Sequence, residues 1–206
     1  MSKKALLIKT AEFIKSSPNF LLCPEPDKPE YAFIGRSNVG KSSLLNMLTN
    51  NSKLAKISSK PGKTQLINHF LINDDWYLTD LPGYGYAKIS KSQRIRWEVF
   101  TIDYLLKRSN LMCVFVLIDS RIKAQKIDLE FMKEMGTNGV PFVMVFTKID
   151  KLSSAEKGKF LKAYQKEILK EWESMPKHFI TSTVSKYGRE DLLHFIHETN
   201  KMFNLD

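Results

Sequence analysis

The segment "GRSNVGKS" at residues 35–42 has residue types and spacing that could bind phosphate groups. Glycines let a loop turn its backbone N–H groups toward phosphate oxygens, and a following helix would present its positive N-terminus to them. Lys41 could reach the β- and γ-phosphates, and the Ser42 hydroxyl could ligate Mg²⁺. The alternative is a glycine turn with no ligand, but the expected strand–loop–helix context favours phosphate binding. The expected nucleotide contacts are Gly35, Arg36, Ser37, Asn38, Val39, Gly40, Lys41, Ser42 and Ser43.

The segment "DLPG" at residues 80–83 could supply a second part of the same site. Asp80 could hold Mg²⁺ through a water, and the N–H of Gly83 could meet a γ-phosphate. An ordinary turn is the alternative, but the nearby phosphate loop favours a site that includes Asp80, Leu81, Pro82 and Gly83. Tyr84 then stands where many nucleotide hydrolases have a glutamine that orients the attacking water. A phenol cannot both donate to and accept from a water as an amide does, so we predict slow hydrolysis.

The base is indicated by "TKID" at residues 147–150. The Asp150 carboxylate could accept hydrogen bonds from N1–H and the 2-amino group of guanine, whereas adenine would leave it unpaired. The segment "TST" at 181–183 could hold the guanine carbonyl oxygen through backbone N–H groups, with the Ser182 hydroxyl stiffening the loop. We therefore expect GTP and GDP as ligands, bound also by Thr147, Lys148, Ile149, Asp150, Thr181, Ser182 and Thr183.

The polar loop "KPGKT" at residues 60–64 completes the predicted site. Thr64 is placed to complete a magnesium shell when a γ-phosphate is present, so GTP would order this loop and hydrolysis would release it. A solvated lysine-rich loop is the alternative. The loop contacts expected with nucleotide are Gly62, Lys63 and Thr64. The predicted catalytic residues are Lys41, Thr64 and Gly83, and the predicted metal ligands are Ser42, Thr64 and Asp80.

Composition is compatible with one main domain in the cytoplasm. The 206 residues are 43% hydrophobic, and the longest apolar run, at 111–118, is too short to span a bilayer. Two cysteines make no disulfide framework, and no signal peptide or lipidation motif is recognisable. The net charge of +10 favours a polyanionic partner such as nucleic acid, although a basic soluble protein without such a partner remains open.

Apolar runs that alternate with helical patterns predict an α/β fold with a mainly parallel sheet, one antiparallel edge strand and helices on both faces. Residues 1–29 are expected to form an N-terminal extension with a proline-rich linker, and residues 30–206 the G domain of a three-layer P-loop GTPase. The motifs follow strands, so all should meet at one sheet edge. Strands are predicted at 31–35, 66–72, 76–80, 111–119, 140–150 and 177–183, helices at 41–49, 96–108, 125–135, 154–173 and 189–203, and a loop at 83–94.

The chain resembles the bacterial EngB/YihA/YsxC family of ribosome-biogenesis GTPases. The matching segments are "AFIGRSNVGKSSLLN" (32–46), "SSKPGKTQLINHF" (58–70), "DLPGYGYAK" (80–88), "YLLKR" (104–108), "LIDSR" (117–121) and "TKIDK" (147–151). The resemblance implies a switch that binds the large ribosomal subunit, or its precursor, in the GTP state and assists its late assembly. It also implies a link with septation and cell division.

The chain departs from the general GTPase pattern at Thr147, where an asparagine is usual, as well as at Tyr84. Asn38 resembles residues that hold K⁺ between the phosphates in related proteins, and the alternative is a role in loop backbone geometry. Help with hydrolysis could come from that cation or from ribosomal RNA or protein. His194 and His197 have no metal-type neighbours in sequence, so no zinc is expected.

Lysines and arginines gather on the two loops that should respond to nucleotide: Lys53, Lys56, Lys60, Lys63, Lys88, Lys91, Arg94 and Arg96. This placement favours contact with ribosomal RNA phosphates, with solubility as the alternative. We expect a monomer that binds neither DNA nor an integral membrane. The rival hypotheses are an ATP-dependent P-loop enzyme, which "TKID" disfavours, and a GTP-controlled adaptor for a division or membrane-associated protein.

Overall fold

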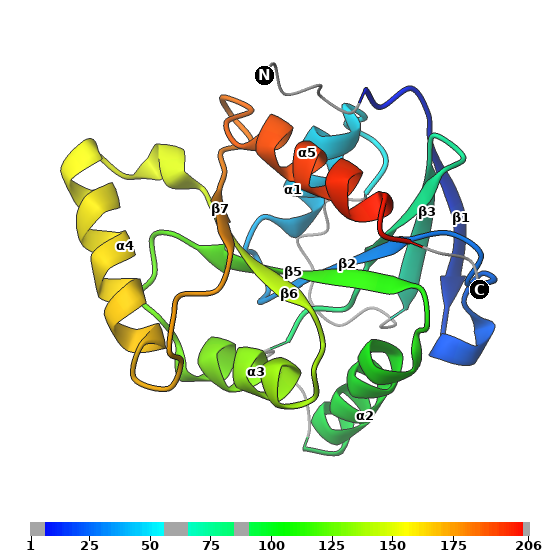
Figure 1. Cartoon of the computed structure of the whole chain (residues 1–206), viewed down its shortest axis with the longest axis horizontal. Coiled ribbons are helices and arrows are strands. Elements are labelled where there is room, and N and C mark those ends of the chain that lie inside the picture. Colours follow the sequence, from blue (N-terminus) through cyan, green and yellow to red (C-terminus); the bar gives the residue numbers. More distant parts are fainter. Residues whose placement is uncertain (1–6, 56–65, 85–90, 204–206) are drawn as a thin grey trace.

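The chain folds around one seven-stranded sheet with the order β1-β3-β4-β2-β5-β6-β7 (Figure 1). The computed structural model describes residues 7–55, 66–84 and 91–203, and of 91–98 the backbone alone. The strands are β1 (Ala11–Ser17), β2 (Glu30–Gly35), β3 (Ile67–Ile72), β4 (Trp76–Asp80), β5 (Leu111–Asp119), β6 (Phe142–Thr147) and β7 (His178–Ile180). The α-helices are α1 (Lys41–Thr49), α2 (Lys91–Lys107), α3 (Lys126–Thr137), α4 (Ser154–Ile168) and α5 (Arg189–Asn200).

The predicted α/β fold is confirmed. Strands β4, β2, β5, β6 and β7 are parallel to one another, while β3 is antiparallel to β4. The tight β3–β4 hairpin turns through Asn73, Asp74 and Asp75. Asn73 and Asp74 both have positive φ, a conformation that asparagine and aspartate tolerate in turns. The parallel strands place their carboxyl ends at one edge of the sheet, and with them the motifs at 35–42, 80–83, 147–150 and 181–183.

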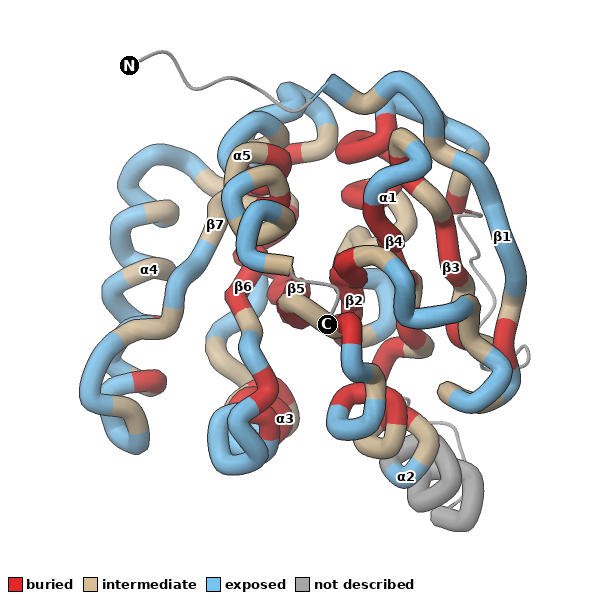
Figure 2. Tube along the Cα trace, turned by 45° about the vertical axis from the view of Figure 1, so that its right-hand side comes forward, coloured by how far each residue is buried: buried red, intermediate tan, exposed pale blue. Residues whose placement is uncertain are grey.

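Side chains of the central strands alternate between two cores, which makes the molecule three-layered. On β2, Tyr31 and Phe33 pack under α1 and α5, whereas Ala32 and Ile34 face the opposite layer. That second core contains apolar side chains from α2, α3 and α4. Figure 2 shows the buried residues along the sheet and on the helix faces that cover it.

The N-terminal segment contributes a strand that the sequence reading did not assign. Strand β1 pairs antiparallel with β3, so β3 is covered on both sides and β1 forms the edge. Four consecutive β1 residues, from Glu12 to Lys15, are exposed, which explains why no buried-strand pattern was recognisable. The register shift between Phe13 and Lys15 further breaks the alternation.

Several element ends differ from the sequence prediction. Helix α2 begins at Lys91, so the expected loop at 83–94 is partly helical. Helix α4 ends at Ile168 rather than 173, and β6 and β7 are shorter than the predicted strands. Helix α4 begins where its sequence predicts, because Ser153 and Glu156 form a reciprocal capping box.

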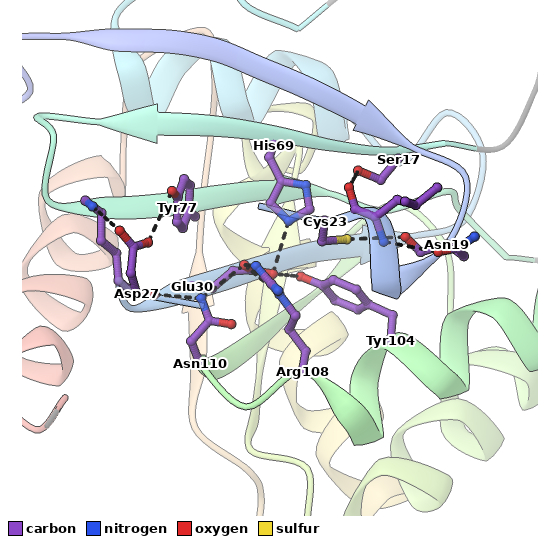
Figure 3. Close-up of polar contacts among 12 residues, drawn as sticks. Ser17, Asn19, Cys23, Asp27, Glu30, His69, Tyr77, Tyr104, Arg108 and Asn110 are labelled. Atoms are coloured by element: carbon purple, nitrogen blue, oxygen red, sulfur yellow. Dashed lines mark hydrogen bonds and ion pairs between the residues drawn. The ribbon is translucent and has the colours of Figure 1, made fainter. Parts of the chain in front are cut away.

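A buried polar cluster lies at the opposite end of β2 from the phosphate loop (Figure 3). The carboxylate of Glu30 accepts hydrogen bonds from the Tyr104 hydroxyl and from Arg108 Nε and Nη2, the latter two at 3.0 and 2.7 Å. His69 Nε2 lies 3.3 Å from the same carboxylate, and Asn110 Nδ2 donates to it at 3.3 Å. The cluster therefore ties β3 and the end of α2 to the start of β2.

Candidate functional site

The phosphate loop has the open backbone shape that its glycines predict. It leaves β2 at Gly35 and enters α1 at Lys41. Asn38 and Gly40 have φ of 62° and 101°, so both adopt the left-handed conformation. No side chain caps the first turn of α1. The N–H groups of that turn, with the positive end of the helix dipole, are suited to an anion.

Asn38 illustrates the two interpretations of this loop. Its positive φ fits the loop-backbone role, since asparagine tolerates the left-handed conformation better than most residues. Asn38 is exposed. Its backbone carbonyl oxygen accepts a 2.6 Å hydrogen bond from Lys148 Nζ.

Lys41 and Asp80 meet at the centre of the site. The Lys41 ammonium forms an ion pair with the Asp80 carboxylate, and both side chains are about five-sixths buried, at 16% exposure each. Burial lowers the pKa of Lys41 to about 7, while the adjacent carboxylate favours the charged ammonium. Phosphate and Mg²⁺ are the natural partners of an ammonium and a carboxylate respectively, so nucleotide with magnesium could satisfy both groups.

Gly83 lies directly against the phosphate loop. A Cβ at this position would lie 2.4 Å from the Gly35 carbonyl oxygen, so only glycine fits without a shift of the backbone. The next residue continues the contact, because Tyr84 N–H donates to the Gly35 carbonyl at 3.3 Å. The sequence prediction that 80–83 and 35–42 form one site thus has a physical basis in this contact.

Tyr84 points into the protein core. Its side chain is 2% exposed, and its ring stacks on Phe131 of α3 with centroids 4.8 Å apart. A phenol in this place cannot orient a water at the nucleotide. Although Tyr84 stands where many nucleotide hydrolases have a glutamine, its side chain packs in the core and takes no direct part in orienting a water.

Thr147 and Lys148 hold the phosphate loop from the side of β6. The Thr147 hydroxyl donates to the Val39 carbonyl at 2.6 Å. Lys148 Nζ donates to the Asn38 carbonyl and, at 2.9 Å, to Asp119 Oδ2. A hydroxyl at position 147 can thus bridge the two motifs although the usual asparagine amide is missing.

Asp119 and Arg121 belong to this arrangement, and the sequence reading gave them no role. Arg121 Nε and Nη2 donate to the two Asp119 oxygens at 2.9 and 2.7 Å. Burial would raise the pKa of Asp119, but the hydrogen bonds from Arg121 and Lys148 outweigh it and lower the pKa to about 2. The available signal was an aspartate at the end of an apolar strand, inside the segment "LIDSR".

A hydrogen bond from Ser182 orients the Asp150 carboxylate and favours its charged form. The Ser182 hydroxyl donates to Asp150 Oδ1 at 2.8 Å, and this hydrogen bond lowers the pKa of Asp150. The same hydroxyl accepts from Val184 N–H and Ser185 N–H, both at 3.3 Å, so it stiffens the loop as expected. Thr181 is buried and bonds to the Phe146 carbonyl, which fixes the loop to β6.

The expected residues thus converge from several parts of the chain. Gly62, Lys63 and Thr64 lie outside the described residues, as do Lys56, Lys60 and Lys88. Within the described residues, no group of three or more histidine, cysteine, aspartate or glutamate side chains could hold a metal ion. Among those same residues, no helix is both long and apolar enough to cross a membrane.

The arrangement suits a nucleoside phosphate. An anion site at the start of α1, a lysine and an aspartate lie close together. Asp150 lies in the short 3-10 helix Ile149–Lys151 that follows β6, and its side chain is 21% exposed. A carboxylate held by Ser182 can accept from adjacent N–H donors, which guanine presents and adenine does not.

Comparison with known proteins agrees with this chemistry. Residues 30–148 match the family model described as "50S ribosome-binding GTPase". A "Probable GTP-binding protein EngB" of Flavobacterium psychrophilum is 56% identical over 195 residues, covering 94% of this chain and 95% of the relative. The protein of the same name from Bacteroides fragilis is 52% identical over 199 residues, covering 96% and 98%.

Solved structures agree on the fold. A probable GTP-binding protein EngB superposes with a TM-score of 0.65 at 23% identity, covering 84% of this chain and 100% of that one. The structure of Era in complex with MgGDPNP and nucleotides of 16S ribosomal RNA has a TM-score of 0.64 at 24% identity, covering 84% and 57%. More than half of the aligned sequence is identical to the EngB proteins of Flavobacterium psychrophilum and Bacteroides fragilis, and the chain carries the phosphate loop and the guanine-type motif. The chain therefore belongs to the EngB family of GTP-binding proteins, P-loop GTPases that hydrolyse GTP.

Proposed function

We propose that this GTPase is a nucleotide-controlled switch that binds the large ribosomal subunit or its precursor, assists its late assembly and is linked to cell division. The observation that carries the proposal is the family match over residues 30–148, whose description names binding to the 50S ribosome. A net charge of +10 supports a polyanionic partner such as ribosomal RNA. Era, a fold neighbour at 24% identity, was solved with a fragment of 16S ribosomal RNA.

Phosphate binding is assigned to the loop from Gly35 to Ser43, with Lys41 at the β- and γ-phosphates. Gly83 N–H would meet the γ-phosphate, which only GTP has. Lys41, Gly83 and Thr64 would stabilise the charge that develops on the transferring phosphoryl group. The ion pair between Lys41 and Asp80 and the contact of Gly83 with Gly35 of the phosphate loop support this assignment.

Magnesium is assigned to Asp80, Ser42 and Thr64. The donors on the described residues fit, because Mg²⁺ prefers carboxylate and hydroxyl oxygens and Asp80 presents a buried carboxylate next to the first turn of α1. Bound magnesium would neutralise phosphate charge, as in other P-loop GTPases. The MgGDPNP in the Era complex supports the same pairing of metal and nucleotide.

Guanine is assigned to Asp150 and the loop of Thr181, Ser182 and Thr183, with Lys148 and Ile149 beside the base. The Ser182–Asp150 hydrogen bond supports this assignment, since it holds the carboxylate in one orientation. Because Tyr84 is buried, intrinsic hydrolysis should be slow. Contact of ribosomal RNA or protein with the segment between Gly83 and the start of α2 would supply the missing help. K⁺ held by Asn38 is a further proposed source of that help.

The remaining proposals concern the whole chain. Residues 30–206 form the G domain, and residues 1–29 are an extension whose strand β1 adds to the sheet edge. The protein acts in the cytoplasm as a monomer, without DNA. The basic residues of the two nucleotide-responsive loops would contact ribosomal RNA in the GTP state. Of the four lysines of the first loop (Lys53, Lys56, Lys60 and Lys63), Lys53 lies within the described residues and is exposed after α1.

Co-sedimentation with purified ribosomal subunits tests the proposal. We expect pelleting with the large subunit in the presence of a non-hydrolysable GTP analogue, weaker pelleting with GDP, and loss of both as salt increases. Binding to neither subunit in either nucleotide state would contradict it and favour the adaptor for a division or membrane-associated protein.

A charge-matched comparison tests the role of the basic loops. Reversal of Lys88 and Lys91 to glutamate should weaken pelleting and its salt dependence. Reversal of Lys162 and Lys166, exposed on α4, changes the net charge equally and should leave binding nearly intact. Equal losses in both double variants would show that net charge alone matters.

A further inference from the structure

The side chain after Gly83 packs against helix α3. The Tyr84 ring stacks on Phe131, with an interplanar angle of 30°. Burial and the nearby Asp128 carboxylate raise the pKa of the Tyr84 hydroxyl, so the hydroxyl and the carboxylate are neighbours. Asp128 and Phe131 are one helical turn apart, so they lie on the same face of α3. The side chain of Asp128 is 3% exposed, which makes it a buried carboxylate outside the nucleotide site.

The same carboxylate reaches the phosphate loop. Asp128 Oδ1 lies 3.5 Å from Nε of Arg36, the second residue of that loop. Arg36 and Tyr84 also pair through their backbones as a parallel bridge. One carboxylate on α3 therefore holds both partners of a backbone contact between the phosphate loop and the segment that begins at Gly83.

Burial of this carboxylate needs an explanation beyond packing. Burial raises the pKa of Asp128, and the positive charge of Arg36 and the neighbouring Tyr84 hydroxyl oppose that effect. An isolated buried carboxylate would destabilise the fold, whereas an apolar residue against Phe131 would pack without that cost. Three neighbours favour a carboxylate here: the Arg36 charge, the Tyr84 hydroxyl and the positive N-terminal end of α3, in whose first turn Asp128 lies.

We infer that Asp128 is a positioning residue that, through Tyr84 and Arg36, fixes the N–H of Gly83 at the phosphate loop and thereby favours GTP over GDP. The inference rests on the proposed contact between Gly83 and the γ-phosphate. GDP has no γ-phosphate, so its binding does not depend on where Gly83 lies. A fixed Gly83 binds the γ-phosphate without an ordering cost, and a loosened one must be ordered as GTP binds.

Tyr84 thus acts in nucleotide recognition through its burial. Its ring and hydroxyl anchor the backbone of the preceding glycine. This role also predicts that a glutamine at position 84 would not restore fast hydrolysis, because the substitution removes the anchor.

Nucleotide titrations on two conservative variants test the inference. Tyr84→Phe removes the hydroxyl and keeps the ring, and Asp128→Asn removes the charge and keeps the shape. For both variants we expect the affinity for a non-hydrolysable GTP analogue to fall about three- to tenfold, the range for loss of one buried polar contact, while affinity for GDP changes less than about twofold. The measurement is equilibrium titration of the full chain with each nucleotide in Mg²⁺.

Tyr31→Phe is the matched control. Tyr31 is also fully buried, and its hydroxyl bonds to Asn200 Oδ1 at 2.6 Å and to the Ile196 carbonyl, on the opposite face of the sheet. This variant should lose stability without a change in the GDP-to-GTP affinity ratio. An unchanged ratio in both Tyr84→Phe and Asp128→Asn would overturn the inference, and so would an equal loss of both nucleotides.

The outcomes separate this inference from the proposed function. If the wild-type chain pelleted with the large subunit in a GTP-dependent way while both variants kept the wild-type ratio, the switch would stand and the anchoring role would fall. If the variants shifted the ratio but no subunit bound, the anchoring role would stand without the ribosome.

Discussion

At the scale of single residues, the hydroxyl of Thr147 makes a contact with the phosphate loop at a position where the general GTPase pattern has an asparagine amide. Thr147 replaces an asparagine, yet its hydroxyl donates to the Val39 carbonyl at 2.6 Å and lies 3.2 Å from the Ile118 carbonyl. The Thr147 side chain is buried, so these bonds are shielded from water. The guanine-type motif and the phosphate loop are therefore joined by one short side chain.

Thr147→Val should loosen the phosphate loop while nearly preserving volume. We expect the free energy of unfolding to fall by about 1–3 kcal/mol, because the buried Val39 carbonyl loses its donor. GDP and the GTP analogue should lose affinity by the same factor, since both use the loop. Denaturant unfolding and nucleotide titration measure the two effects. Thr147→Ser keeps the hydroxyl and is the control. A selective loss of GTP alone would contradict the shared role.

Asp150→Asn should change base preference. The new amide would direct its NH₂ group, a donor, at the 2-amino group of guanine, which is also a donor. Xanthine has a carbonyl at that position, which can accept the hydrogen bond. We expect at least about a tenfold loss of GDP affinity and a gain for xanthosine diphosphate. Competition titrations with both nucleotides measure this. Asp103→Asn, at an exposed ion pair on α2, should change neither. Retained GDP affinity would remove Asp150 from the guanine site.

Motif residues were predictable from sequence because glycine spacing, strand ends and charge type constrain them locally. Asp119 and Asp128 were not, because the partners that tie them to the site, Lys148, Arg36 and Tyr84, are distant in sequence. Asp119 meets Lys148, and Asp128 meets Arg36 and Tyr84, only after β5, α3 and the phosphate loop are assembled. The burial of Tyr84 likewise depends on Phe131, which no local pattern around residue 84 indicates.

At the scale of elements, the Glu30 cluster joins β2 to β3 and to the end of α2. It lies a full strand away from the phosphate loop, about 20 Å at the usual rise per residue. Both oxygens of Glu30 have donors from distant elements, and the side chains of Glu30 and His69 are fully buried (Figure 3). This cluster fixes where β3 and α2 lie relative to the central strand.

Glu30→Gln should therefore destabilise the fold strongly. The substitution leaves Arg108, whose side chain is 6% exposed, without its carboxylate, so we expect a loss of about 3–5 kcal/mol in the free energy of unfolding at pH 7. Urea unfolding measures this. Glu198→Gln, at an exposed ion pair with Lys201 on α5, should leave stability unchanged. A loss similar to that of the control would show that the cluster does not hold the elements together.

The same cluster predicts acid sensitivity with a defined sign. Burial would raise the pKa of Glu30, but His69 and Arg108 outweigh it and lower the pKa from 4.5 to about 2. The unfolded chain therefore binds a proton at higher pH than the folded one, and the stabilisation from Glu30 is complete above about pH 4.5 and lost as pH falls toward 2. The stability difference between wild type and Glu30→Gln should shrink over that interval. A constant difference would contradict it.

Most helices and strands were predictable from the sequence, but the first and last residues of several of them were not. Helix α1, β4 and β5 begin and end where apolar spacing predicts, because these elements are bounded by glycine, aspartate or turn residues. Strand β1 could not be recognised, since it is an exposed edge whose pairing is decided by β3. The earlier start of α2 lies in a polar, lysine-rich stretch where no periodicity is visible.

At the scale of the whole molecule, the nucleotide site and the Glu30 cluster occupy opposite ends of the same sheet. The parallel strands carry the motifs at their carboxyl ends, and the buried ion pairs hold their amino ends. Nucleotide can then bind at one edge without disturbing the packing at the other. Binding should stabilise the molecule as a unit, because phosphate loop, β4, β6 and β7 all contribute residues to the site.

Saturating GDP with Mg²⁺ should raise the melting temperature. At a ligand concentration about 100 times Kd, linkage adds about 2.7 kcal/mol, which is about 5–10 °C for a chain of this size. ATP at the same concentration should add little, because adenine leaves Asp150 unpaired. Chelation of Mg²⁺ should reduce the GDP shift, since Lys41 alone would then oppose the charge of Asp80 and the phosphates. Thermal melts with GDP, ATP and EDTA measure all three. An ATP shift equal to that of GDP would contradict the guanine assignment, and a GDP shift indifferent to EDTA would remove Asp80 from the metal site.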